Sequence, residues 1–234
     1  MSNISYKSES ICAISSPQGV GGVALIRTSG DDALSIVNSI FSKSLLDIQG
    51  YSVLYGKILE KSIEIDHVIV TVFKNPNSFT GENVVEISCH GSVYIQYKIL
   101  ELLCENGARL ALPGEFSKRA FFNGKLDLSQ TEAIADLINS RSSAAHDIAI
   151  KQMRGGFSSE LKTLRGKLID FASLIELELD FSEEDVEFAD RKKFKELVAK
   201  ITHVLKRLID SFSFGNAMKN GIPVAIIGEP NVGK

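Results

Sequence analysis

Tryptophan is absent from this 234-residue sequence, and cysteine, with three residues, is scarce. Cys12, Cys89 and Cys104 are an odd number without C-x-x-C spacing, so we expect a reduced, cytoplasmic protein and no disulfide framework. Cys89 is followed by His90, but neighbouring residues of a strand point to opposite faces, which argues against a catalytic or metal-binding pair. The other histidines are scattered, and their spacing does not indicate a metal site.

Long apolar runs and an excess of positive charge are also missing. No run approaches the roughly 20 apolar residues of a membrane-spanning helix, and the first residues lack the pattern of a secretion signal. The net charge is −3, which argues against a strongly basic nucleic-acid-binding surface and leaves a local basic patch open. What is present is 44% hydrophobic residues, enough for one or two cores. Because no apolar run is long enough to span a membrane, we expect no membrane partner.

Three regions differ in their hydrophobic periodicity. In the first, residues 1–118, short apolar runs alternate with turn signals, which predicts an α+β domain with a mostly antiparallel sheet. We expect Asp31 or Asp32 to cap the first helix and Gly107 to end the second. The expected strands are 11–15, 23–28, 51–59, 63–73 and 84–88, and the expected helices are 33–41 and 93–106.

The second region, residues 119–218, is expected to be helical and to form an incomplete α-helical bundle. Ser129, with Glu132 three residues later, predicts a capping box at one helix start. Two later helices carry apolar residues at alternating steps of four and three, which is typical of nearly antiparallel helices. We interpret both stripes as bundle core, with a partner-binding face as the alternative. The acidic segment 180–188 between them is interpreted as a solvated helix start, with metal binding as the alternative.

The third region, residues 219–234, contains the stretch PVAIIGEPNVGK. Its apolar run 224–227 predicts a strand buried on both faces. Residues 228–234 fit G-x-x-x-x-G-K, the loop whose backbone N–H groups surround phosphates and whose lysine reaches the outer ones. The pattern predicts the first strand and phosphate loop of an α/β nucleotide-binding domain, and a Gly/Pro turn that leaves a strand is the alternative.

Three residues before the phosphate loop are candidates for a binding site. Arg27 ends an apolar strand, where a guanidinium can hold a carboxylate or phosphate by paired hydrogen bonds. Glu86 lies inside an apolar strand, where it can accept paired N–H donors of a heterocycle, and Lys125 lies in a glycine turn before a helix. Taken alone, each is better explained as a solvated surface charge. Neither composition nor spacing joins them into one site.

Five stretches together resemble the tRNA modification GTPase family MnmE, also called TrmE. They are GVGGVALIRTSG, PNSFTGENVVEISCHGS, PGEFSKRAFFNGKLDLSQTEAIADLI, IELELDFSEEDVEF and IIGEPNVGK. They occur in the order and spacing of the family, from near residue 12 to residue 234, and their combination is highly specific.

The resemblance implies that region 1–118 is a folate-binding and dimerisation domain, similar to folate-dependent aminomethyltransferases. Arg27, Glu86 and Lys125 match the family's contacts to 5-formyl-tetrahydrofolate or a related one-carbon tetrahydrofolate. As a hypothesis, Glu86 accepts the amino and ring N–H donors of the pterin, and Arg27 or Lys125 pairs with the anionic tail.

The resemblance also implies a GTP hydrolase. In the family a Ras-like G domain interrupts the helical domain, and GTP hydrolysis with K⁺ and Mg²⁺ drives a conformational change. With the FAD protein MnmG (GidA), the homodimer installs an aminomethyl or carboxymethylaminomethyl group on the wobble uridine of certain tRNAs. By match, the residues that contact GTP are Asn231, Val232, Gly233 and Lys234, and Asn231 is also the K⁺ ligand.

Elements that follow the phosphate loop in the family are missing: the Ser or Thr that holds Mg²⁺, the switch segments, and the D-x-x-G and N-K-x-D motifs. We therefore expect no catalytic residues in this chain, and no tight GTP binding or hydrolysis by the chain alone. Three interpretations stay open: the N-terminal part of a tRNA-modifying GTPase, a catalytically silent folate-binding dimerisation module, and an unrelated P-loop ATPase. Folate binding separates the first two from the third.

Overall fold

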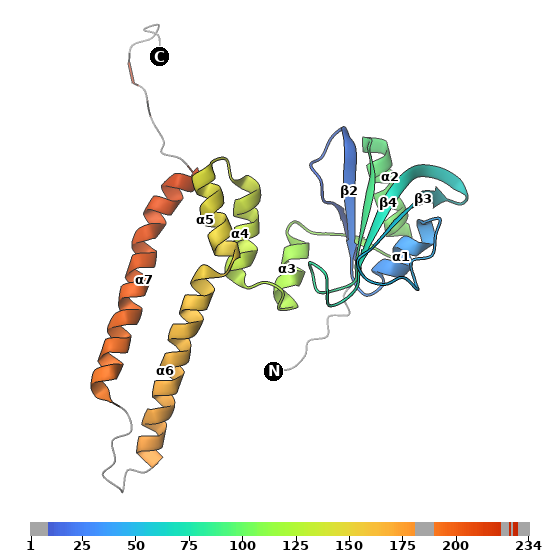
Figure 1. Cartoon of the computed structure of the whole chain (residues 1–234). Helices are drawn as coiled ribbons and strands as arrows, with labels where there is room; N and C mark the ends of the chain where they lie inside the picture. The colour runs from blue at the N-terminus through green and yellow to red at the C-terminus, as the bar shows by residue number, and fades with distance from the viewer. Residues whose placement is uncertain (1–8, 181–189, 221–224, 226, 229–234) are drawn as a thin grey trace. The chain divides into compact units, whose positions relative to one another are not determined.

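The computed structural model describes residues 9–180, 190–220, 225, 227 and 228. The chain divides into two compact units, Met1–Leu126 and Asp127–Lys234 (Figure 1). Of the expected acidic turn, residues 181–188 lie outside the described part, so neither interpretation of that turn is tested. The same holds for residues 229–234 of the phosphate loop.

A single sheet of six strands forms the centre of the first unit, in the order β3-β4-β5-β2-β1-β6. Its strands are β1 Ile11–Ile14, β2 Gly21–Ser29, β3 Ser52–Glu60, β4 Ile63–Phe73, β5 Val84–Gly91 and β6 Arg109–Leu110. All neighbours are antiparallel except β1 and β6, which are parallel. The predicted α+β domain with a mostly antiparallel sheet is therefore confirmed.

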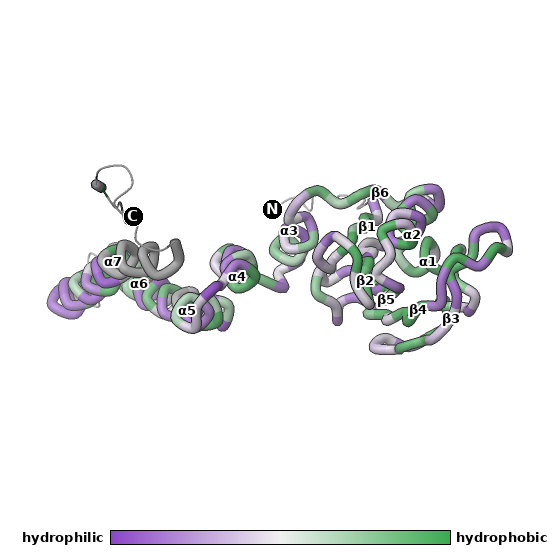
Figure 2. The backbone as a smooth tube through the Cα atoms, turned by 90° about the horizontal axis from the view of Figure 1, so that it is seen from above, coloured by the Kyte–Doolittle hydropathy of each residue, from purple (hydrophilic) through white to green (hydrophobic). Residues whose placement is uncertain are grey.

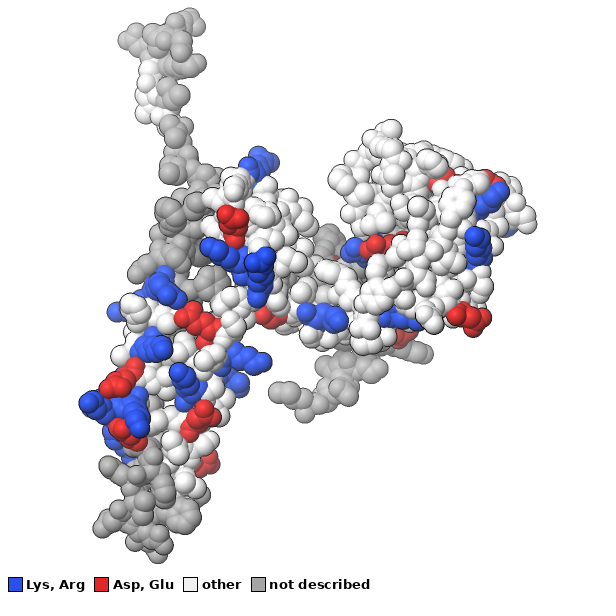
Figure 3. Space-filling model, in the orientation of Figure 1, with Lys and Arg blue, Asp and Glu red and all other residues white. Residues whose placement is uncertain are grey.

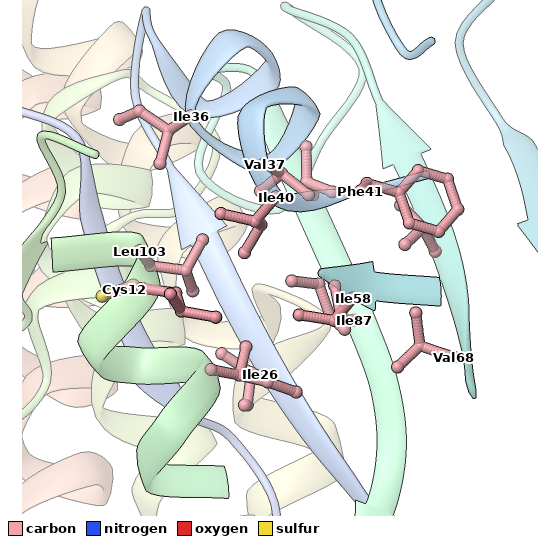
Figure 4. Close-up of a cluster of buried hydrophobic side chains, with 14 of the residues drawn as sticks. Cys12, Ile26, Ile36, Val37, Ile40, Phe41, Ile58, Val68, Ile87 and Leu103 are labelled. Atoms are coloured by element: carbon pink, nitrogen blue, oxygen red, sulfur yellow. The ribbon is translucent and has the colours of Figure 1, made fainter. Parts of the chain in front are cut away.

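Two helices, α1 (Ala33–Ile40) and α2 (Val93–Glu105), cover one face of this sheet and close the hydrophobic core. Figure 2 shows both helices on the same side of β2, β5 and β4. Alternate strand residues such as Ile26 and Ile87 point into the core and are fully buried. Figure 4 shows them gathered with side chains of α1 and α2 in one cluster.

The starts and ends of these helices agree only partly with the sequence. Asp32 occupies the N-cap position of α1, but its side chain makes no cap hydrogen bond. Instead, the backbone N–H of Asp32 donates to Ser10 Oγ at 3.1 Å, so a residue from before β1 satisfies this donor. Gly107 follows α2 with φ of +104°, as a glycine C-terminal stop requires, and that prediction is confirmed.

The opposite face of the sheet is covered only in part, by helix α3 (Glu115–Phe122) and the connection 74–83. Away from this cover, apolar side chains of the same face are exposed, among them Val53, Tyr55 and Ile69. On the face of the first unit seen in Figure 3, only a few side chains are charged. The first unit thus has one closed apolar face and one open one.

Helix α3 belongs to the first unit, although the sequence predicts a domain boundary at residue 118. Arg119, in the middle of α3, donates to the carboxylate of Glu82, which lies just before β5. Because this ion pair is almost buried, it holds α3 on the sheet, and the division between units falls after Leu126.

The second unit is helical, as predicted, and contains α4 (Leu128–Asn139), α5 (Ser143–Met153), α6 (Gly156–Asp180) and α7 (Arg191–Asn220). Helices α6 and α7 run side by side (Figure 1), and the rings of Phe171 and Phe194 stack between them at 4.5 Å. Along the described residues, no helix is long and apolar enough to cross a membrane.

The predicted capping box of α4 is wrong by two residues. Asp127, not Ser129, is the N-cap: its carboxylate accepts the backbone N–H of Gln130 at 2.8 Å. In return, Gln130 Oε1 accepts the backbone N–H of Asp127 at 2.9 Å. Both pairs of residues have the spacing of a capping box, but Ser129 is already inside the helix, where its side chain cannot cap it.

Candidate ligand-binding site

Arg27 and Glu86 lie opposite each other on the neighbouring strands β2 and β5. Both point away from the core, because the residues beside them in each strand, such as Ile26 and Ile87, point into it. Arg27 donates to Glu86 Oε1 through Nε at 2.8 Å and through Nη2 at 2.7 Å. Among the described residues, the second carboxylate oxygen of Glu86 has no donor, so it is open to a donor on a ligand.

Two aromatic rings flank the guanidinium of Arg27. Its Cζ lies 5.4 Å from the ring centroid of Phe79, in the connection 74–83, and 5.6 Å from that of Phe116, in α3. Each cation–π contact contributes roughly 0.5–2 kcal/mol, depending on how far the charge is removed from water. The rings therefore fix the guanidinium and leave an apolar, partly exposed surface around the ion pair.

Lys125 lies in the turn after α3 and adjoins the pair through Phe79. Its Nζ donates to the carbonyl oxygen of Pro76 at 3.0 Å. The side chain lines a hollow of about 270 Å³, whose other lining residues are Tyr51, Phe73, Asn77, Ser78 and Phe79. The structure thus brings Arg27 and Glu86 into contact, and places Lys125 beside the same aromatic ring that flanks Arg27.

A network of buried polar groups holds the connection 74–83 in place. Glu82 is 8% exposed, and its carboxylate accepts Ser29 Oγ at 2.7 Å and Arg119 Nη1 at 3.1 Å. Asn123 Nδ2 donates to the carbonyl of Thr80 at 2.7 Å. Because these bonds join β2, the connection and α3, they fix where the two rings stand relative to Arg27.

Close packing beside this network involves Gly81 and Lys125. Gly81 has φ of +79°, and a Cβ placed there would meet Lys125 Cγ at 3.2 Å. A larger residue would be strained in this backbone conformation and would push the lysine stem aside. The position of Lys125 beside the hollow therefore depends on a glycine at residue 81.

Glu115, at the start of α3, is the most strongly perturbed carboxyl of this part of the molecule. Two hydrogen bonds from Arg109, at 2.7 and 3.0 Å, lower its pKa to about 2, helped by the backbone N–H of Leu112 and by Arg119. The carboxylate therefore stays ionised down to strongly acidic pH and keeps α3 bonded to β6.

In the described part of the chain, no group of His, Cys, Asp and Glu side chains is placed to hold a metal ion. Burial raises the pKa of Cys89 to about 11, with a smaller contribution from Asp66, so its thiol stays protonated at neutral pH. His90 is on the other side of the strand, where its ring contacts Asp66 at 2.6 Å. Cys89 is therefore a buried thiol, whereas the neighbouring His90 has an exposed ring that pairs with Asp66.

Phe79, Phe116 and the Glu82–Arg119 pair were not predicted from the sequence as parts of the site. A weak signal for Phe79 exists, because it is the one aromatic residue in the polar stretch KNPNSFTGEN. The predicted GTP and K⁺ contacts Asn231, Val232, Gly233 and Lys234 lie outside the described residues, so they stay predictions.

Two protein-family models match the chain, one for each unit. Residues 10–125 match the model described as "GTP-binding protein TrmE N-terminus", and residues 128–223 match "MnmE helical domain". A TrmE-type sheet domain followed by an MnmE-type helical domain thus defines the class of the protein. The chain belongs to the MnmE (TrmE) family of tRNA modification GTPases.

Curated relatives agree with this assignment. The chain is 59% identical over 230 residues to "tRNA modification GTPase MnmE" of Flavobacterium johnsoniae, covering 97% of this chain and 49% of the relative. Proteins of the same name from Cytophaga hutchinsonii and Bacteroides thetaiotaomicron are 54% identical, covering 99% and 97% of this chain and 50% of each relative. The chain spans about half the length of the curated relatives it matches.

Proposed function

We propose that the first unit binds 5-formyl-tetrahydrofolate or a related one-carbon tetrahydrofolate, as part of a tRNA wobble-uridine modification GTPase. The observation that carries the proposal is the Arg27–Glu86 pair, flanked by Phe79 and Phe116, on the partly open face of the sheet. An ion pair beside aromatic rings offers a flat heterocycle both hydrogen bonds and stacking surface.

The geometry supports a division of roles between the three residues. Glu86 presents its second carboxylate oxygen to the amino and ring N–H donors of a pterin, while Arg27 keeps the carboxylate oriented. Because Arg27 is already paired with Glu86, Lys125 is the better placed of the two cations to receive the anionic tail of the folate.

Calorimetric titration of the 234-residue chain with 5-formyl-tetrahydrofolate tests this proposal. Glu86→Ala should weaken binding by about 10- to 100-fold, the effect expected from losing hydrogen bonds to a charged group. Glu101→Ala is a matched control, because Glu101 is an exposed carboxylate on α2 whose ion pair is with Lys98. Unchanged affinity of the Glu86→Ala protein, with unchanged circular dichroism, would show that the assignment is wrong.

We further propose that the chain forms a homodimer through the first unit. The exposed apolar side chains Val53, Tyr55 and Ile69 lie on the neighbouring strands β3 and β4 of the open face, and they support this because a contiguous exposed apolar patch marks an interaction surface. Sedimentation of the sample used for the folate titration measures the oligomeric state, and a monomer at all concentrations would contradict it.

In the whole protein we propose GTP hydrolysis with K⁺ and Mg²⁺, with Asn231 as K⁺ ligand and residues 231–234 on the phosphates. With the FAD protein MnmG, it would install aminomethyl or carboxymethylaminomethyl groups on the wobble uridine of tRNA. Deleting the gene and analysing tRNA nucleosides by mass spectrometry tests this function, and intact wobble modification would refute it.

The alternative is a catalytically silent folate-binding module, which needs only the Arg27–Glu86 pair and its two flanking rings. The alternative predicts folate binding without GTP turnover by this chain. Measurable Mg²⁺-dependent GTP hydrolysis by the pure 234-residue chain would exclude it, and ATP binding without folate binding would favour an unrelated P-loop ATPase.

A further inference from the structure

We propose that Cys12 and Cys104 form an oxidative modification site. Hydrogen peroxide converts the two thiols into a reversible disulfide that ties helix α2 to strand β1. This inference is independent of the folate proposal, because Cys12 lies in the hydrophobic core, on the face of the sheet opposite to Arg27 and Glu86.

The two sulfur atoms are already in contact. Sγ of Cys12 lies 3.9 Å from Sγ of Cys104, although the residues are 92 positions apart in the sequence. Figure 4 shows the side chain of Cys12 pointing toward α2. A disulfide bond is about 2.05 Å long, so the sulfurs have to approach each other by roughly 2 Å. Cys104 is the last residue but one of α2, where the end of a helix frays, so a small movement there brings the sulfurs together.

The two thiols differ in exposure, which gives each a separate role. Cys12 is fully buried, and this burial, together with the neighbouring Cys104, raises the pKa of Cys12 to about 12. It therefore stays protonated at neutral pH and is shielded from an oxidant in solution. Cys104 is only partly buried, so peroxide can reach it. We assign Cys104 as the thiol that is oxidised first and Cys12 as the thiol that resolves the product.

The reaction takes two steps. In the first, the sulfur of Cys104 attacks one oxygen of hydrogen peroxide, the O–O bond breaks, and a sulfenic acid and one water form. In the second, the sulfur of Cys12 attacks the sulfur of the sulfenic acid. The S–S bond forms, the S–O bond breaks, and the departing hydroxide takes the proton of Cys12 to become water. The two thiols lose two electrons in all, and one peroxide is reduced to two waters.

Cys89 is a control that the chain itself provides. It is buried like Cys12, but its thiol donates to the carbonyl oxygen of Ala24 at 3.6 Å. Among the described residues, its sulfur is not in contact with another thiol. A sulfenic acid needs a neighbouring thiol to form a disulfide, so we expect Cys89 to stay reduced.

The disulfide closes a loop that contains most of the sheet unit. Strands β2 to β5 and helix α1 all lie between Cys12 and Cys104 in the sequence. Closing a long loop restricts the unfolded chain more than closing a short one. The bond therefore acts as a clamp that peroxide closes and that a thiol reductant opens by exchange.

Peroxide treatment of the native 234-residue chain, followed by trypsin digestion and mass spectrometry, tests the site. Each cysteine lies in a different tryptic peptide, and these peptides are 8–27, 75–98 and 99–109. We expect peptides 8–27 and 99–109 to appear as a linked pair that is two hydrogen atoms lighter than the sum of the two. Peptide 75–98 should keep a thiol that iodoacetamide labels after unfolding. Treatment of the urea-unfolded chain should remove this preference, because the contact between the sulfurs is lost.

Two matched variants locate the effect. Cys104→Ala should abolish the linked pair, whereas Cys89→Ala should form it at the wild-type rate. The urea midpoint of the sheet unit should rise by roughly 1–2 M when the link forms and should return after treatment with dithiothreitol. If a variant does not fold by circular dichroism, the peptide map of the wild-type chain decides alone.

Three results would overturn the proposal. In the native chain, oxidation of Cys104 to sulfinic acid without a link, or a link that involves Cys89, would show that the two sulfurs do not form the site. A rate of linking that rises with protein concentration would show that the bond joins separate chains. An unchanged urea midpoint of the linked chain would show that the disulfide is not a clamp.

Discussion

The two units of the chain bury their apolar residues to different extents. In the sheet unit, large side chains such as Ile26, Ile58 and Leu103 are fully buried in one cluster (Figure 4). In the described residues of the helical unit, only a few side chains are buried, and leucines such as Leu161 and Leu168 stay more than a third exposed. The first unit therefore closes its hydrophobic core with its own residues, whereas the second presents apolar stripes that another surface can cover.

Charge is also used differently in the two units. In the sheet unit, ionised groups belong to a buried network of hydrogen bonds. The ion pair of Glu82 and Arg119 is an example, with side chains that are 11% and 12% exposed. In the helical unit the pair Arg207–Glu160 joins α7 and α6 at the surface, with 60% and 40% of the side chains exposed. On the face seen in Figure 3, both signs of charge are interspersed along α6 and α7. Breaking a pair should therefore have very different effects in the two units.

The largest effect is expected for Arg119→Met, which leaves Glu82 charged and almost buried without its main partner. We expect the free energy of unfolding of the sheet unit to fall by about 3–5 kcal/mol. Arg207→Met, the matched change at the surface pair, should cost about 1 kcal/mol or less. Urea unfolding followed by circular dichroism measures both, with hydrogen exchange of β2 and β5 amides for Arg119→Met and of α6 and α7 amides for Arg207→Met. Equal losses would show that the comparison of the two ion pairs is wrong.

A second comparison concerns the cores. Ile87→Ala removes a fully buried side chain from the sheet unit, and we expect a loss of about 2–4 kcal/mol. Leu168→Ala in α6 removes a side chain that is 37% exposed, and its cost should be about 1 kcal/mol. Thermal unfolding of both variants tests this difference. A larger loss for Leu168→Ala would mean that its stripe is covered in solution.

Acid should weaken the sheet unit through Glu115. Its pKa is about 2 in the folded protein and near 4.5 when unfolded, so the unfolded state binds the proton first as the pH falls. The stabilisation is complete well above the unfolded pKa and is lost as the pH falls from about 4.5 to 2, at a cost of at most about 3 kcal/mol. Glu115→Gln should flatten this part of the pH profile of the free energy of unfolding. A profile identical to wild type would contradict the assignment to Glu115.

The smallest effect is expected at the start of the helical unit. Asp127→Ala removes the N-cap of α4 and should cost about 1 kcal/mol, whereas Ser129→Ala, inside the helix, should be nearly neutral. Thermal unfolding measured on the two variants side by side decides between the two capping boxes. If Ser129→Ala lowers the stability more than Asp127→Ala does, the capping box predicted from the sequence is the correct one.

Much of the local structure follows from the sequence, because hydrophobic periodicity and turn residues act over short distances. The strands 63–73 and 51–59 and the two long helices were predictable on this basis. The start of α4 was not, since Asp127 with Gln130 and Ser129 with Glu132 have the same spacing. Only the backbone geometry distinguishes the two boxes.

The candidate site was predictable only as separate residues. Contact between Arg27 and Glu86 depends on the register of β2 and β5, which no local pattern specifies across 59 positions. The same holds for Phe116, which reaches the site because Arg119 holds α3 on the sheet. Long-range pairing therefore forms the site from residues that look like ordinary surface groups.

The parallel pairing of β1 with β6 has a consequence for the synthesis of the protein. Glu9 and Arg109 are ion-paired although they are 100 positions apart, and β6 adds its two residues beside β1. At translation rates of about 5–20 residues per second, roughly 5–20 s separate the appearance of the two partners. During that time β1 is an unpaired sheet edge on the nascent chain, and its length of four residues limits the surface on which other chains can pair.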